Sequence, residues 1–129
     1  MKLLKHVPGV LLGLGMVVFG LAKLVPILPE PDTAAFSAGH LAFMSAAAAS
    51  GYFLQFIGAA EFVGGLLLLS RRFEALGALV LAPISANIVV FHLALAPATT
   101  GPGAVVLLLN VVILLLNTSK YRAILAGTK

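Results

Sequence analysis

Four long apolar runs constrain the fold of this chain more than any other feature. They extend from Val7 to Leu28, from Gly51 to Ser70, from Phe73 to Ala96 and from Thr100 to Asn117. Each is close to the length of about 20 residues with which a helix crosses a hydrocarbon core. With 61% hydrophobic and 9% charged residues and a mean hydropathy of +1.15, the chain is too apolar for a soluble enzyme. We therefore expect an all-α, polytopic membrane protein in which residues 1–129 form one four-transmembrane-helix bundle in the lipid bilayer.

The basic residues predict how this bundle is oriented. Four successive crossings bring seven of the eight lysines and arginines to one side: Lys2, Lys5, Arg71, Arg72, Lys120, Arg122 and Lys129. The two other connections carry no lysine or arginine, and the first holds Glu30 and Asp32. Cytoplasmic loops carry an excess of basic residues, so we expect a multi-pass protein of the cell inner membrane with both termini in the cytoplasm. The basic residues form no stripe, which argues against a nucleic-acid partner.

The segment between the first two runs differs from them. Residues from Ala34 to Ala49 are rich in helix formers, and Asp32 or Thr33 is a suitable cap. Gly51 separates this segment from the second run. We expect a short amphipathic helix on the outer face, and the alternative is a re-entrant segment.

Few polar residues fall within the bundle, and function must be sought among them. Of the charged residues, Lys23 and Glu61 are assigned to the bundle and the other ten to its outside. A charge in the bilayer costs about 2.5 to 3.5 kcal/mol, so such residues pair or line a pathway. Glu61 shares a helix face with Gly58 and Gly65, and Lys23 shares one with the glycines of its own run, so both faces suit close helix contact.

Depth along the helices complicates a direct pair. At a rise of about 1.5 Å per residue, Lys23 and Glu61 differ in depth by about 12 Å. Helix tilt and an inward-bent lysine side chain would close part of this gap. Gln55, a water molecule or a ligand are the alternative links. A structural ion pair and a site that binds or protonates a ligand both stay open.

The third and fourth runs add further polar residues. Pro83 removes one helical hydrogen bond, and Asn87, one turn later, is placed to satisfy the freed backbone. Asn87 and His92 are five residues apart, about 140° around a helix, so they should not point into one small pocket. Asn110 is expected to form an interhelical hydrogen bond. The candidate ligand-binding residues are Lys23, Gln55, Glu61, Asn87 and His92.

The chain lacks the residues that several kinds of catalytic or metal site require. There are no cysteines, which excludes disulfides, thiol catalysis and thiolate metal sites. Three histidines without clustered carboxylates predict no metal site. Haem is disfavoured, because His40 and His92 have no spacing signature for axial ligands. No catalytic residue is identified.

A series of motifs then indicates a family. In chain order they are Gly20-Leu21-Ala22-Lys23-Leu24, Phe43 to Gly51 with Tyr52-Phe53, Glu61-Phe62-Val63-Gly64-Gly65, Arg71-Arg72-Phe73, Ala82-Pro83 with Asn87, and Phe91-His92-Leu93. In their order and spacing they resemble the DoxX-like family of small four-helix bacterial membrane proteins over nearly the whole chain. The resemblance singles out Lys23, Glu61, Pro83, Asn87 and His92. It implies association with quinone-linked redox complexes, because the family name comes from a subunit associated with a thiosulfate:quinone oxidoreductase.

Two hypotheses of different classes follow. The first is a redox-associated membrane subunit that binds a quinone or another lipophilic molecule in its bundle, with Glu61 exchanging a proton or countering charge. The second is a non-catalytic scaffold or assembly protein whose buried polar residues fix helix register. A small-molecule transporter is a third alternative. The expected partners are proteins of a redox complex, and a homodimer through a glycine face is a further expectation.

Overall fold

All regular secondary structure in the described part of the chain is helical. The structure, a computed structural model, describes residue 1 and residues 3–127, and within them it contains no strand. The α-helices are α1 (Val7–Leu24), α2 (Ala38–Ala49), α3 (Phe53–Leu69), α4 (Glu74–Leu95), α5 (Thr100–Leu116) and α6 (Thr118–Leu125), and the 3-10 turns are η1 (Leu4–His6), η2 (Thr33–Ala35) and η3 (Pro97–Thr99). The predicted all-α class is confirmed.

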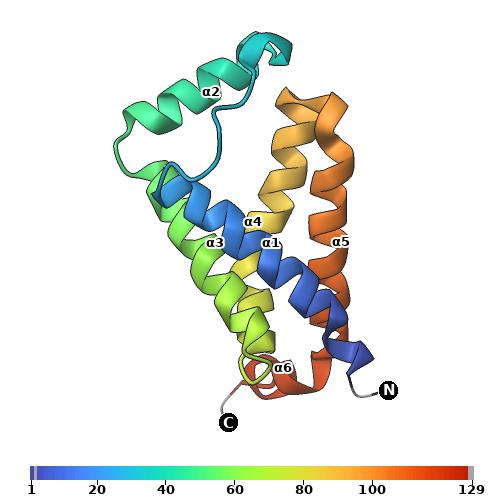
Figure 1. The fold of residues 1–129 in the computed structure, drawn as a ribbon. Helices are drawn as coiled ribbons and strands as arrows, with labels where there is room; N and C mark the ends of the chain where they lie inside the picture. Colours follow the sequence, from blue (N-terminus) through green and yellow to red (C-terminus); the bar gives the residue numbers. More distant parts are fainter. Residues whose placement is uncertain (2, 128–129) are drawn as a thin grey trace.

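The four long helices run alternately up and down (Figure 1). The start of α1, the short α6 and the turn between α3 and α4 lie at one end of the molecule, and α2 and η3 lie at the other. The basic residues of the described part that flank the helices therefore gather at one end: Lys5, Arg71, Arg72, Lys120 and Arg122. Lys2 and Lys129 lie outside the described residues.

Three helical segments are long and apolar enough to cross a membrane: Leu4–Leu24, Glu74–Leu95 and Pro97–Leu116. The remaining predicted span, the second along the chain, corresponds to α3, whose 17 residues stand at the lower end of the spanning range. It joins α2 at an angle of 90°, and the bent pair counts as a fourth span only when taken together. A membrane protein is consistent with this architecture, while the four-span arrangement stays a prediction.

Local sequence explains where the helices begin and end. The first run was expected to stay helical to Leu28, but α1 stops at Leu24 because Val25 is extended (φ −136°, ψ 142°) and precedes Pro26, which disfavours helical backbone. Gly51 separates α2 from α3 as predicted, with a φ of +76°. Asp32 caps only η2, through Ala34 N. The cap of α2 is Ser37, so that helix starts later than expected.

Glycines set the closest helix contact, between α1 and α3. A Cβ atom on Gly20 would lie 2.6 Å from the Gly58 carbonyl oxygen and 2.6 Å from Phe62 N. The glycine faces predicted for these two helices are therefore contact faces. The buried core lies beside this contact and comprises Leu12, Met16, Leu68, Ala78, Leu81 and Ile113.

Candidate functional site

A cavity of about 640 Å³ lies among α1, α2, α3, α4 and the start of α5. Helices α3 and α4 pack closely near the basic end, where a Cβ on Gly77 would lie 2.9 Å from the Gly64 carbonyl oxygen, and they diverge toward α2 (Figure 1). The cavity occupies this divergence. Its wall is mainly aromatic and aliphatic, with phenylalanines from four helices: Phe19, Phe43, Phe53, Phe56 and Phe91.

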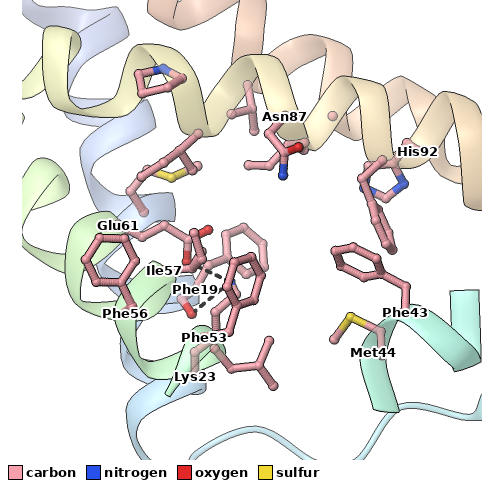
Figure 2. A pocket seen from close by; sticks show the side chains of 18 of the residues that line it. Phe19, Lys23, Phe43, Met44, Phe53, Phe56, Ile57, Glu61, Asn87 and His92 are labelled. Atoms are coloured by element: carbon pink, nitrogen blue, oxygen red, sulfur yellow. Dashed lines mark hydrogen bonds and ion pairs between the residues drawn. The ribbon is translucent and has the colours of Figure 1, made fainter. Parts of the chain in front are cut away.

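Lys23 and Glu61 form a direct ion pair in this wall. The distance from Lys23 Nζ to Glu61 Oε2 is 2.6 Å, and Figure 2 shows the pair on the α1 and α3 side of the cavity. Glu61 is buried with 3% of its surface exposed, whereas the Lys23 side chain is 30% exposed. The carboxylate is therefore neutralised by a lysine that still reaches solvent or the cavity.

The expected depth difference of about 12 Å between Lys23 and Glu61 does not keep their side chains apart. That estimate counted the rise per residue as if every helix axis were perpendicular to the membrane. Figure 1 shows α1 crossing α3 obliquely. The contact of Gly20 with Gly58 places Lys23 and Glu61 about one turn to either side of the same crossing point, because α1 and α3 run in opposite directions. The lysine also bends back, with its Nζ 3.5 Å from the Phe19 carbonyl oxygen.

Asn87 and His92 reach the same cavity from α4 (Figure 2). Their angular separation of about 140° argues against one small pocket, but this cavity is large and extends along α4 from Pro83 to His92, so both residues line it. His92 Nδ1 lies 2.8 Å from Thr99 Oγ1. Asn87 was expected to satisfy the backbone group freed by Pro83. In the structure its side chain lines the cavity.

Gln55 does not belong to this group. It is exposed on α3 and is not among the described residues that line the cavity. The reason is angular, since Gln55 precedes Glu61 by six residues and six residues turn a helix by about 240° beyond one full turn. A relay through Gln55 is unnecessary in any case, because Lys23 and Glu61 touch directly.

His40 is a cavity residue that sequence reasoning did not select. Its ring stacks on Phe36 with centroids 4.1 Å apart and meets Phe91 edge-on at 5.0 Å. It lines the cavity from α2, and its buried Nδ1 has no hydrogen-bond partner among the described residues. The helical spacing of Phe36, His40 and Phe43 was the available signal, but only the packing of α2 against α4 shows where that face points.

A second buried carboxylate lies at the basic end. Glu74 was counted outside the bundle, yet it is only 2% exposed, and its Oε2 lies 2.6 Å from His6 Nδ1. Nearby, the Tyr121 hydroxyl donates to the Ala75 carbonyl oxygen at 2.9 Å. Burial, and next the Glu74 charge, raise the pKa of Tyr121 above 10.0. The arrival of α1 and α6 beside the start of α4 buries Glu74, and this tertiary contact has no local signature in the sequence.

A buried polar contact also joins α4 to α5. In the orientation that pairs both ends of the Asn110 amide, its oxygen accepts from Ser85 Oγ at 3.0 Å and from Ala82 N at 3.2 Å, and its nitrogen donates to the Ala78 carbonyl oxygen at 3.2 Å. The interhelical hydrogen bond expected of Asn110 is thus present. Within the described residues, no group of three or more histidine, cysteine or acidic side chains is placed to hold a metal ion.

Comparisons with family models, with characterised proteins and with solved structures find no match. The resemblance to the DoxX-like family therefore depends on the quoted motifs alone and stays a prediction.

Proposed function

We propose that this chain is a membrane protein that binds a lipophilic molecule with a polar head in the cavity between α3 and α4. One observation carries the proposal: polar side chains from α1, α3 and α4 converge on one otherwise apolar cavity. Four of the five predicted residues, Lys23, Glu61, Asn87 and His92, line it. Its volume of about 640 Å³ falls within the range of small-molecule sites, which are apolar with a few convergent polar groups.

The apolar and polar side chains that line the cavity would make different contacts with the ligand. Phenylalanine rings supply the apolar contact area for a ring or chain. Lys23 has donor capacity beyond its bond to Glu61, and the Asn87 amide both donates and accepts. We propose a quinone as the ligand of first choice, because its ring carbonyls match these donors and its tail matches the apolar wall. Glu61 would then exchange a proton with the bound head or counter its charge.

The cellular setting is part of the same proposal. We propose four membrane crossings with the bent α2–α3 pair as one of them, α2 at the outer face, and both termini in the cytoplasm of the bacterial inner membrane. The basic residues at one end of the molecule support this orientation. We further propose membership of the DoxX-like family and a role as a subunit beside redox-complex proteins, with a second copy of the chain as a further partner.

Binding of decylubiquinone to protein in detergent micelles tests the ligand proposal. A ligand that binds only the folded state raises the unfolding temperature with concentration. We expect this rise in wild type, and affinity about tenfold weaker in Glu61→Gln, the effect of one lost hydrogen bond to a charged group. Gln55→Ala, an exposed change on the same helix, is the matched control. Absence of a shift in wild type, or an equal loss in Gln55→Ala, would contradict the proposal.

One observation favours a scaffold as the second candidate. Lys23 and Glu61 contact each other directly at 2.6 Å, as a purely structural pair would. A scaffold requires the pair only for register, so Lys23→Met combined with Glu61→Leu should keep both the fold and the captured partner proteins. Loss of the partners from a folded double variant would count against this candidate.

A further inference from the structure

A groove at the basic end of the molecule lies outside the cavity described above. Its volume is about 260 Å³. Arg71, from the turn between α3 and α4, and His6 line it together with aliphatic residues near the start of the chain: Leu3, Leu4, Val7, Val10 and Leu11. Among the described residues it shares no lining side chain with the cavity between α3 and α4. It is therefore a second, separate candidate site.

The apolar wall of the groove continues along α1. Leu4, Val7 and Leu11 recur at intervals of three and four residues, and Leu14 and Val18 extend the series. Side chains at this spacing form one face of a helix. Each of them is between 46% and 68% exposed, so the rest of the described chain leaves this face largely uncovered. In a helix that crosses the bilayer, such a face lies beside lipid acyl chains.

Arg71 has an unusual backbone for a residue with a side chain. Its φ is +55°, in the left-handed region that glycine adopts most readily. It follows Ser70, the C-cap of α3, and glycine is the usual residue just after a helix end with this geometry. Because the turn itself would be better served by glycine, the arginine points to a role of its side chain beyond the turn.

No carboxylate of the described residues balances Arg71. The exposed acidic residues, Glu30 and Asp32, lie in the connection from α1 to α2, at the other end of α1 from the groove. The buried ones, Glu61 and Glu74, each contact a different basic partner. A guanidinium without a carboxylate is a ready partner for phosphate, which it binds through two parallel hydrogen bonds.

We propose that this groove binds an anionic phospholipid of the cytoplasmic leaflet, with the phosphate at Arg71 and an acyl chain along the exposed face of α1. An arginine beside an apolar wall matches both parts of a phospholipid. A choline headgroup fits less well, because its cation offsets the attraction to Arg71 and is repelled by the other basic residues at this end: Lys5, Arg72, Lys120 and Arg122. The proposal rests on the membrane setting inferred above, but not on the ligand of the cavity.

Native mass spectrometry tests the preference. The protein is released from dodecyl maltoside micelles that hold equal amounts of phosphatidylglycerol and phosphatidylcholine with identical acyl chains. We expect wild type to retain phosphatidylglycerol about fivefold over phosphatidylcholine, the ratio for one basic residue beside an anionic headgroup. In Arg71→Gln the preference should fall below about twofold.

Arg72→Gln is the matched control, because it removes the same charge from the same turn. The Arg72 guanidinium lies over the Phe73 ring, 5.4 Å from its centroid, and Arg72 does not line the groove. This variant should keep most of the preference. An equal loss in both variants would indicate general attraction to the basic end and would overturn the groove as a site.

Arg71→Gly separates lipid binding from folding. Glycine relieves the left-handed backbone, so the unfolding temperature in dodecyl maltoside alone should be no lower than that of wild type, while the lipid preference is lost. A preference that survives in Arg71→Gly would overturn the proposal. So would displacement of the lipid by millimolar inorganic phosphate, which would assign Arg71 to a free anion, or a dimer without lipid, which would assign the groove to a second copy.

The groove and the cavity can fail independently. Decylubiquinone binding should be unchanged in Arg71→Gln, because the two sites share no described lining residue. Equal retention of both phospholipids by wild type would overturn the groove and leave the cavity proposal standing. Retention of neither would overturn the groove and count against the membrane setting as well.

Discussion

Gly20→Ala is predicted to loosen the contact between α1 and α3. The added Cβ would lie 2.6 Å from both the Gly58 carbonyl oxygen and Phe62 N. Both atoms are backbone, so no change of rotamer relieves the overlap and the helices must separate. The separation also pulls at Lys23 and Glu61, which lie one turn further along each helix and whose charged atoms are 2.6 Å apart.

The size of the effect follows from two opposing terms. Overpacking a well-packed contact costs about 1 to 3 kcal/mol, and a backbone clash belongs at the upper end. Against this cost, alanine has a higher helix propensity than glycine, which stabilises the folded state by up to about 1 kcal/mol. We expect Gly20→Ala to lower the free energy of unfolding by about 2 kcal/mol, a change of roughly 30-fold in the folding equilibrium.

Reversible unfolding in mixed micelles, followed by circular dichroism while the fraction of sodium dodecyl sulfate is raised, measures this change. Gly15→Ala is the control on the same helix, because a Cβ there meets no atom of the described residues within 4 Å. It should be unchanged or more stable by up to about 1 kcal/mol. If Gly20→Ala were as stable as wild type, or Gly15→Ala equally destabilised, close packing at Gly20 would not be the cause.

Three further predictions concern the buried polar groups. Lys23→Met alone leaves Glu61 buried without its partner and should cost about 3 kcal/mol, most of which Glu61→Leu in the same chain restores; unfolding in mixed micelles measures both, and a stable single variant would contradict the pairing. A double-mutant cycle of Ser85→Ala and Asn110→Leu should give a coupling energy of about 0.6 to 1.7 kcal/mol, and zero coupling would mean that the hydrogen bond is idle. The folded chain holds the Tyr121 proton to higher pH than the unfolded chain, since burial and then the nearby Glu74 charge raise its pKa. The free energy of unfolding should therefore fall as pH rises above 10.0 through the folded pKa, and this fall should be smaller in Tyr121→Phe.

Features that depend on one helix at a time could be predicted from the sequence. Hydropathy places the long helices, and spacing of about 3.6 residues per turn identifies the glycine faces around Gly20 and Gly58. Pro26 and Gly51 act on the backbone beside them, so their effect is local as well. The candidate residues Lys23 and Glu61 were found for a similar reason, because a charge in an apolar run is conspicuous wherever the helix packs.

Features that depend on how helices meet could not be predicted in this way. His40 looks like one more residue of an apolar face until α2 folds against the end of α4. Counted along α3, Gln55 lies between Lys23 and Glu61 in depth, and its angle around the helix directs it away from the cavity. Glu74 follows the Arg71-Arg72 turn by two residues, where a solvent-exposed side chain is expected, and it is buried because α1 and α6 pack beside the start of α4.

These contacts give α1 a role beyond packing. His6, just before the helix, pairs with Glu74 at the start of α4, and Lys23, near its end, pairs with Glu61 on α3, each at 2.6 Å. A slide or rotation of α1 by one residue would break both pairs and leave two carboxylates buried without partners, which is strongly unfavourable. The two pairs therefore specify a single register for α1. Because Phe19 and Lys23 line the cavity, that register also fixes the shape of the proposed ligand site.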